Sequence, residues 1–184
     1  MQQQIKDAKA RMDRTIETLR SELAKVRTGK ATTVLLDSIR VDYYGNMVPL
    51  TQVGNVSVLD AHTLSITPWE KQMVQVIDKA ILEANLGLNP ISDGTNLKIP
   101  IPPLNEERRK ELVKLVKKFG EEAKVAIRNV RRDANDHLKK EQKDKKMTED
   151  QLHDAEKEMQ KLTDDHIKLI DDLLKHKEKE IMEV

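Results

Sequence analysis

Pro102-Pro103-Leu104-Asn105-Glu106-Glu107 marks the point at which this chain of 184 residues changes character. All six prolines lie between positions 49 and 103, and proline is excluded from helix interiors. The flanking segments contain no such helix breaker, so they can form long helices. A second change occurs at Thr28-Gly29-Lys30. We therefore predict a helical domain of residues 1–29 and 105–184, interrupted by an inserted domain of residues 30–104.

The flanks are predicted to form three long helices, each with one apolar stripe. In residues 5–26 the apolar side chains recur at spacings of three and four, as in a coiled coil. The second helix starts after Asn105 as N-cap and continues to about residue 144, with Gly120 as a weak point. The third opens with Thr148-Glu149-Asp150-Gln151, the pattern of a capping box. An elongated antiparallel three-helix bundle buries all three stripes.

The middle segment is predicted to be a small β/α/β domain. Residues 39–43 alternate apolar and polar side chains before a turn at Gly45-Asn46, which indicates a hairpin. Thr67-Pro68-Trp69-Glu70 has the pattern of a helix N-terminus, with Thr67 as N-cap and Pro68 as first helical residue. Further strands are expected at 56–58, 64–66 and 96–99. The predicted fold class is therefore α+β.

The composition excludes several classes of protein. The absence of cysteine excludes a disulfide framework, a thiol nucleophile and a cysteine-ligated metal. The histidines have no metal-type spacing, and His166 on an apolar stripe is expected to be packed rather than to bind a metal. No catalytic motif is present, so we expect neither enzymatic activity nor a cofactor. No apolar run approaches the roughly 20 residues that span a bilayer, and the N-terminus lacks a signal sequence, so we expect a soluble, cytoplasmic protein.

Charge is distributed unevenly along the chain. The formal net charge is +1, but residues 1–30 carry 8 basic and 4 acidic side chains, and residues 106–146 carry 15 and 9. On a helical wheel of the second flank, cationic residues form a stripe about 100° to 200° from Val130, away from the apolar positions. Guanidinium groups match phosphate geometry, so the stripe favours binding of a polyanion. Its cationic members are Lys117, Lys124, Arg128, Arg131 and Arg132.

A solvated helix surface with intrahelical ion pairs, such as Glu121 with Lys124, is the alternative interpretation. If the partner is a nucleic acid, the four aromatic residues limit how it is bound. Tyr43 and Tyr44 are adjacent on a predicted strand and should face opposite sides, so they are not expected to form a stacking platform. We therefore expect recognition through backbone and shape rather than through base sequence.

Five motifs in the same order resemble ribosome recycling factors over essentially the whole chain: Arg27-Thr28-Gly29-Lys30-Ala31, Val41-Asp42-Tyr43-Tyr44-Gly45, Leu86-Gly87-Leu88-Asn89-Pro90, Pro102-Pro103-Leu104-Asn105-Glu106-Glu107-Arg108-Arg109 and Arg128-Asn129-Val130-Arg131-Arg132-Asp133-Ala134-Asn135-Asp136. Asn105 replaces the usual threonine of the family, which is also an N-cap residue. The resemblance implies an L-shaped two-domain molecule, which binds the large ribosomal subunit after termination. With elongation factor G and GTP, such factors split the ribosome into subunits.

The resemblance also implies roles for individual residues. Arg27, Arg128 and Arg131 would contact ribosomal RNA with support from Arg132, and the wheel adds Lys117 and Lys124. The chain is expected to be a monomer with two hinges, formed by Gly29, Lys30 and Ala31 and by Pro103, Leu104 and Asn105. A chaperone for free RNA and a coiled-coil adaptor that forms oligomers remain the alternatives from other functional classes.

Overall fold

The computed structural model describes residues 2–183 and divides into two compact units. The first unit consists of Met1–Val26 and Lys110–Ile181, and the second of Arg27–Arg109 and Met182–Val184. Each unit has its own secondary structure, helical in the first and mixed in the second. The predicted α+β class, a helical domain with a small β domain, is confirmed.

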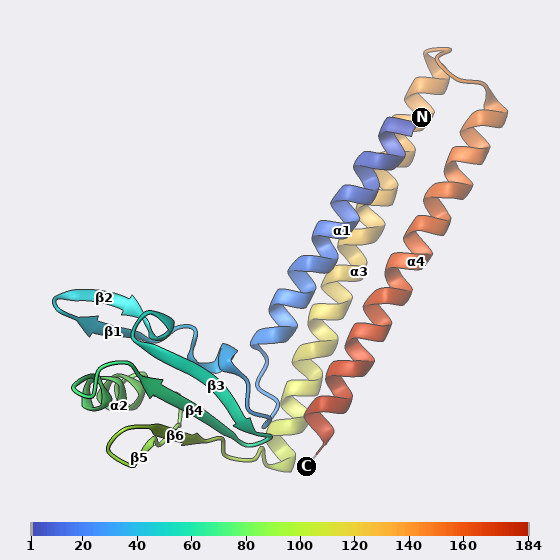
Figure 1. Cartoon of the computed structure of the whole chain (residues 1–184). Coiled ribbons are helices and arrows are strands. Elements are labelled where there is room, and N and C mark those ends of the chain that lie inside the picture. The colour runs from blue at the N-terminus through green and yellow to red at the C-terminus, as the bar shows by residue number, and fades with distance from the viewer. Residues whose placement is uncertain (1, 184) are drawn as a thin grey trace. The chain divides into compact units, whose positions relative to one another are not determined.

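Three long helices make up the first unit: α1 (Gln2–Lys25), α3 (Glu106–Lys143) and α4 (Glu149–Met182). They lie side by side in Figure 1, and α3 runs opposite to the other two. Cross-helix contacts agree with this direction, because Gln4 and Arg11 of α1 bind Glu141 and Asp133 of α3. The 38 residues of α3 give it a length of about 57 Å.

Both predicted helix starts in this part of the chain are confirmed. The backbone N–H of Arg108 donates to Oδ1 of Asn105 at 2.7 Å, so Asn105 caps α3. In the capping box of α4, the N–H of Gln151 donates to Thr148 Oγ1 at 3.2 Å, and the N–H of Thr148 donates to Gln151 Oε1 at 3.0 Å. These bonds satisfy backbone donors that have no partner within the helix. None of the helices in residues 2–183 is both long and apolar enough to cross a membrane.

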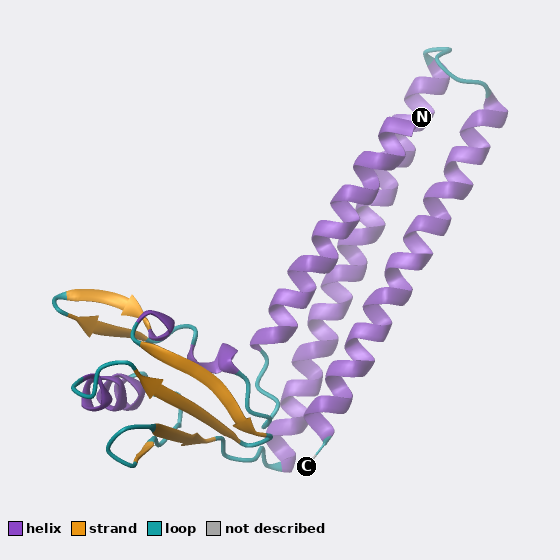
Figure 2. Cartoon of the chain, in the orientation of Figure 1, coloured by secondary structure: helices purple, strands orange, loops and turns teal. Residues whose placement is uncertain are grey.

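The second unit contains two antiparallel sheets and one helix, shown in orange and purple in Figure 2. One sheet is the hairpin of β1 (Arg40–Tyr43) and β2 (Asn46–Pro49). The other has the strand order β3-β4-β6-β5. Its strands are β3 (Gly54–Asp60), β4 (Thr63–Pro68), β5 (Ile91–Ser92) and β6 (Leu97–Pro100). Two short 3₁₀ helices, η1 (Thr33–Leu36) and η2 (Leu50–Gln52), flank the hairpin.

Helix α2 (Met73–Glu83) shares one apolar core with both sheets. Its buried residues Val74, Ile77 and Ile81 belong to the same cluster as Val41 of the hairpin and Leu64 of β4. Burial of such side chains contributes roughly 1.5–3 kcal/mol each, so this core is enough to hold the hairpin against the helix. The polar face of α2 is left at the surface.

The predicted start of α2 was wrong. Pro68 is the last residue of β4, where it pairs with Gly54, and α2 begins only at Met73. The N-cap is Gln72, which makes no side-chain capping bond. Proline suits a strand end as well as a first helical position, and here the pairing with β3 decides between the two.

The prediction that Tyr43 and Tyr44 face opposite sides was also wrong. Tyr44 lies in the turn after β1 with φ of 50°, and Gly45 follows with φ of 86°. The left-handed backbone brings the two rings together, with centroids 4.7 Å apart in an edge-to-face arrangement. Both hydroxyls donate to the carboxylate of Glu70, at 2.5 Å and 2.9 Å.

Candidate nucleic-acid interface

Arg128 and Arg132 are the least engaged members of the cationic stripe. They lie four residues apart on α3, beside the buried residues Ile127 and Val130 but on the outer side of the helix. Among residues 2–183, neither guanidinium has a hydrogen-bond or ion-pair partner. Lys117 on the same helix is exposed and likewise has no partner among these residues. These three side chains are available to an anion from outside the chain.

Arg131 is turned toward α4, where it meets a neutral group. Its Nη1 donates to Oε1 of Gln160 at 3.0 Å, and Nε2 of Gln160 donates to Asp164 at 2.8 Å. An amide does not neutralise the charge, and one hydrogen bond uses only one of the five donors of the guanidinium group. Arg131 is therefore oriented by Gln160 while most of its donors stay unused.

Lys124 is engaged in ion pairs. Its Nζ lies 2.6 Å from Asp171 on α4 and 3.7 Å from Glu121, and the side chain is only 16% exposed. The predicted pair with Glu121 is present, but the closer partner belongs to another helix. Two carboxylates already compensate this cation, so Lys124 is the weakest phosphate ligand of the stripe.

Arg27 belongs to the second unit, whereas the residues of the stripe belong to the first. Its Nη1 donates to the backbone carbonyl of Leu86 at 3.4 Å, while Nε and Nη2 are buried without a hydrogen-bond partner in the described part of the chain. Unpaired buried guanidinium donors are costly, so an acceptor from outside the chain would stabilise this arginine.

A further cation, Arg14 on α1, was missed by the sequence analysis. It is exposed and lines a shallow groove of about 380 Å³ between α1 and α3, together with Arg11 and Asn129. Arg11 binds Asp133 at 3.0 Å, whereas the guanidinium group of Arg14 has no partner among residues 2–183. A helical wheel of α3 alone could not have found it, because the groove is made by two helices.

The predicted hinge residues lie at two chain segments that are close together. A Cβ atom added to Gly29 would lie 3.7 Å from both the backbone nitrogen and Cγ of Leu104. Gly29 has φ of 75°, which favours glycine, and Asn105 caps α3 directly after Leu104. Beside these segments lies a cavity of about 490 Å³, lined by residues of the second unit that include His62, Pro103 and Arg109.

Ala31 is bound to the turn between β3 and β4. Its N–H donates to the carbonyl of Ala61 at 2.8 Å, and the N–H of Ile101 donates to the carbonyl of His62 at 2.7 Å. Both bonds end on the turn between β3 and β4. Lys30 instead forms an ion pair with Glu183 at 2.5 Å, with both side chains nearly half exposed. The carbonyl oxygen of Gly29 also lies 3.2 Å from Nδ1 of His62, so Gly29 and Ala31 both contact this turn.

Comparison with known proteins identifies the family. The sequence profile of ribosome recycling factors matches residues 19–182. This chain belongs to the ribosome recycling factor family. It is 58% identical over 179 residues to the ribosome-recycling factor of Thioalkalivibrio sulfidiphilus (strain HL-EbGR7), which covers 97% of each chain. The factor of Ralstonia pickettii (strain 12J) is 55% identical over 97% of this chain and 96% of its own.

Solved structures of ribosome recycling factors are similar over the whole chain. One is a solution structure with 42% sequence identity and a TM-score of 0.76, covering 100% of this chain and 97% of the other. The second is the Thermus thermophilus factor, described as a model with Escherichia coli elongation factor G bound to the E. coli post-termination complex. It is 43% identical, with a TM-score of 0.66, over 99% of this chain and 98% of that chain.

Proposed function

We propose that this chain recycles ribosomes together with elongation factor G. It binds the large ribosomal subunit of the post-termination complex, and GTP hydrolysis by the elongation factor drives separation of the subunits. Membership of the family supports the recycling function. The related factor described with elongation factor G on a post-termination complex supports the two partners. In this role the protein acts as a monomer in the cytoplasm.

The observation that carries the proposed RNA contact is the pair of unpartnered arginines, Arg128 and Arg132, on the outer face of α3. Phosphate groups of folded ribosomal RNA are the complementary partner, because a guanidinium group binds two phosphate oxygens at once. Arg131, oriented by Gln160, and the exposed Lys117 extend the same surface. Lys124 contributes least, because Asp171 already binds it.

Arg27 is proposed as a separate RNA contact. Its two buried donors without partners would be satisfied by a phosphate or carbonyl oxygen of the ribosome. This contact would lie in the second unit, so its loss should add to the loss of Arg128 rather than replace it.

We also propose that residues 1–29 with 105–184 and residues 30–104 act as two domains that move about two hinges. The hinges are Gly29, Lys30 and Ala31 and, on the return crossing, Pro103, Leu104 and Asn105. Gly29 supports the first hinge, because a residue without Cβ has access to a wide range of backbone conformations. The bond from Ala31 to Ala61 sets the limit of that hinge toward the inserted domain.

Sedimentation of post-termination ribosomes in sucrose gradients tests the proposal. With the protein, elongation factor G and GTP, ribosomes should convert to free subunits, and omission of any of the three should prevent the conversion. The Arg131→Lys variant keeps the charge but loses the planar fork, so its binding to ribosomes should weaken. Unchanged binding and splitting by this variant would contradict the role of Arg131.

The same assay separates the alternative functions. An RNA chaperone would bind free RNA as tightly as ribosomes and would release no subunits. A coiled-coil adaptor would form oligomers and would tolerate replacement of Arg128 and Arg132 by alanine. Release of subunits that depends on these arginines would exclude both.

A further inference from the structure

Strand β1 has one edge that no other strand of residues 2–183 covers. It pairs with β2 alone, in the register Arg40 with Pro49, Val41 with Val48, Asp42 with Met47 and Tyr43 with Asn46. Tyr44 and Gly45 form a two-residue turn with positive φ at both positions, so the flanking pair, Tyr43 and Asn46, is hydrogen-bonded.

Alternation along the strand then places Arg40 and Asp42 at non-hydrogen-bonded positions, with their backbone N–H and C=O groups directed away from β2. The proline opposite Arg40 agrees with this assignment, because Pro49 has no N–H to give to a ladder. Within residues 2–183, no backbone hydrogen bond reaches these outer groups of Arg40 and Asp42 from another element. The free edge of β1 therefore offers two donors and two acceptors.

A groove of about 560 Å³ runs along this edge. One wall is formed by five consecutive residues of the chain, 38–42, together with Met47 of β2, and the other by one face of α2 and its C-cap. The groove-lining residues of α2 and its C-cap recur at helical spacing: Val76, Lys79, Ala80, Glu83 and the C-cap Ala84. The apolar residues on this face are small, which leaves space between the helix and the strand.

We propose that the groove binds an extended segment of a partner polypeptide, which adds to β1 as a third strand of the hairpin sheet. Backbone groups of Arg40 and Asp42 would bind alternate peptide groups of the segment, as in strand addition to other sheet edges. The four residues of β1 extend over about 13 Å, so a segment of similar length is enough to use the whole edge.

The residues of the groove define the chemistry of this segment. Side chains on one side of the added strand would face Val76, Ala80 and Ala84, which favours apolar residues at alternate positions. The side chains between them would lie next to Arg40 and Asp42, both exposed. An acidic residue beside Arg40 and a basic residue beside Asp42 complement these charges.

The occupant is argued to be a peptide strand because the unpaired groups belong to the backbone. A small apolar ligand would fill the groove but leave the two donors and two acceptors of the edge unused. The edge is short and carries charged residues, which disfavours pairing between two copies of this chain. The proposal concerns a surface separate from the arginines of α3 and is independent of their role.

Synthetic seven-residue peptides added to the ¹⁵N-labelled full-length protein test the proposal by NMR. The peptides carry glutamate and lysine in alternation at outward positions, and alanine, valine, leucine or phenylalanine at the positions between them. At least one should shift the amide signals of Arg40, Asp42, Val76 and Ala80. Absence of shifts with all four peptides at millimolar concentration would overturn the proposal.

Two N-methylated isomers of the best peptide provide a control that leaves the protein unchanged. Methyl groups on the amides that face β1 remove two hydrogen bonds and should weaken binding about tenfold or more. Methyl groups on the intervening amides should have little effect. Equal binding of both isomers would show that the peptide does not add as a strand and would overturn the proposal.

Blocking the groove provides a second control. Ala84→Trp fills it from an exposed position and should abolish the shifts, whereas Gln75→Trp, at an exposed position of α2 that does not line the groove, should preserve them. If the peptide still binds to Ala84→Trp, the binding site is not this groove. Concentration-dependent broadening of β1 signals without peptide would assign the edge to a second copy instead and would overturn the proposal.

Discussion

Gly120 of α3 faces Leu174 of α4 so closely that a side chain at position 120 would require the side chain of Leu174 to move. A Cβ atom built on Gly120 would lie 2.2 Å from Cδ1 of Leu174 and within 3.0 Å of its Cδ2 and Cγ. Both residues are buried. Gly120, which the sequence alone marks as a weak point of the helix, is therefore a site of close packing between α3 and α4.

We expect Gly120→Ala to destabilise the protein. Alanine gains about 1 kcal/mol over glycine in helix propensity, but overpacking of a core costs typically 1–3 kcal/mol. Contact with three atoms of Leu174 makes the second effect the larger, so the unfolding free energy should fall by about 1 kcal/mol. Urea unfolding followed by circular dichroism measures the difference.

The effect of Gly120→Ala on the unfolding free energy should reverse its sign when Leu174 is shortened. In the Leu174→Ala background the clash is removed, so Gly120→Ala should raise the unfolding free energy by about 1 kcal/mol through helix propensity alone. If Gly120→Ala destabilises both backgrounds equally, Leu174 is not the cause of the loss.

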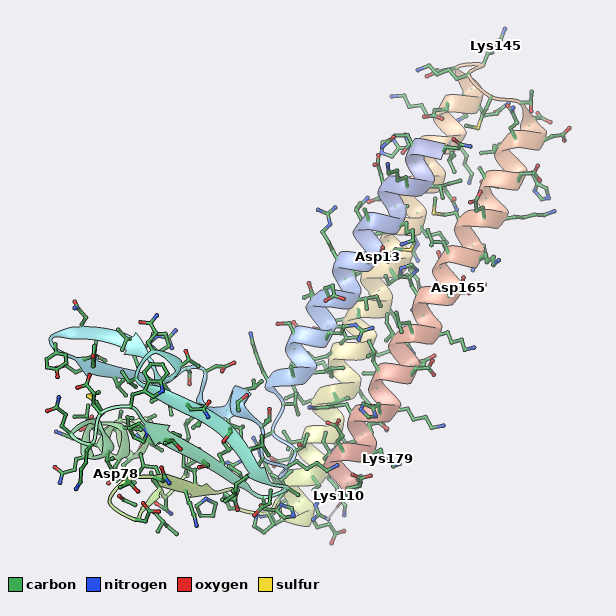
Figure 3. All side chains as sticks on the ribbon, in the orientation of Figure 1. Asp13, Asp78, Lys110, Lys145, Asp165 and Lys179 are labelled. Atoms are coloured by element: carbon green, nitrogen blue, oxygen red, sulfur yellow. The ribbon has the colours of Figure 1, made fainter. Side chains whose placement is uncertain are left out.

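A second prediction concerns His166, which is 7% exposed and links α4 to α1. Its Nδ1 lies 2.7 Å from the carbonyl oxygen of Leu162, and its Nε2 lies 2.7 Å from Oδ1 of Asp13. Figure 3 labels Asp13 on α1. His166 thus joins the backbone of its own helix to a carboxylate of α1. Asp13→Ala should lower the unfolding free energy by about 1 kcal/mol, because Nε2 loses its partner. Asp13→Asn, whose amide keeps a hydrogen-bonding group beside Nε2, should lose less.

The effect of Asp13 should depend on pH. The pKa of the Asp13 carboxyl lies below its ordinary value. The hydrogen bond from Lys9 is the largest cause, and the hydrogen bond with His166 is the second largest. A carboxylate with a lowered folded pKa stabilises the protein fully above its unfolded pKa of about 3.9, and this contribution is lost as pH falls through the folded pKa. The difference between the wild type and Asp13→Ala should thus shrink in urea unfolding at low pH. A constant difference from neutral pH to pH values below the folded pKa would contradict the ionic contribution.

Two lysines of α3 should respond oppositely to the same substitution. Lys124 is mostly buried against Asp171, so Lys124→Met should lower stability, by about 0.5–1 kcal/mol for a pair that is half exposed on the aspartate side. Lys117 is exposed and has no partner in residues 2–183, so Lys117→Met should leave stability unchanged but weaken ribosome binding, most strongly at low salt. Thermal unfolding and ribosome sedimentation measure the two effects. If Lys124→Met weakens ribosome binding and leaves stability unchanged, Lys124 binds the ribosome and does not stabilise the fold.

The hydrogen bonds between Tyr43, Tyr44 and Glu70 give a prediction that needs no ribosome. The hydrogen bonds from both tyrosines lower the pKa of Glu70, and the bond from Tyr43 has the larger effect. The same bonds raise the pKa of Tyr43 and of Tyr44. Tyr43→Phe should therefore move the pKa of Glu70 upward, toward its ordinary value, in a ¹³C carboxyl NMR titration. Thr51→Val, an exposed substitution in η2, serves as control and should leave it unchanged. No movement in Tyr43→Phe would show that the tyrosine does not donate to Glu70 in solution.

The helices of the first unit could be predicted from local signals. Asn105 and the Thr148–Gln151 capping box define where α3 and α4 begin, because their bonds join residues three apart in sequence. The start of α2 could not be predicted in this way. Pro68 satisfies the local pattern of a helix start, but its pairing with Gly54 of β3, a partner distant in sequence, makes it the end of a strand.

The cationic stripe shows the same limit for the candidate site. The periodicity of α3 correctly places most of its apolar residues inward, among them Ile127 and Val130. It cannot tell which cations are already compensated, because Asp171 and Gln160 lie on α4. Likewise, Tyr44 lies in a turn and has a left-handed backbone. The alternation of side chains that holds within a strand therefore predicts the wrong direction for its side chain.

Insertion of glycine at the two crossings tests the proposed hinges. One glycine inserted after Gly29 and one after Pro103 lengthens both connections, without disturbing the bond from Ala31 to Ala61 or the cap of α3 by Asn105. The arginines of α3 keep their environment, so binding to ribosomes should be preserved. Splitting with elongation factor G and GTP should fall, because looser connections transmit less of the force that acts on one domain to the other. A single glycine inserted after Gly94, in an exposed turn with positive φ, serves as a control and should leave both activities intact. Full splitting activity of the double insertion would show that defined connections between the domains are not needed for recycling.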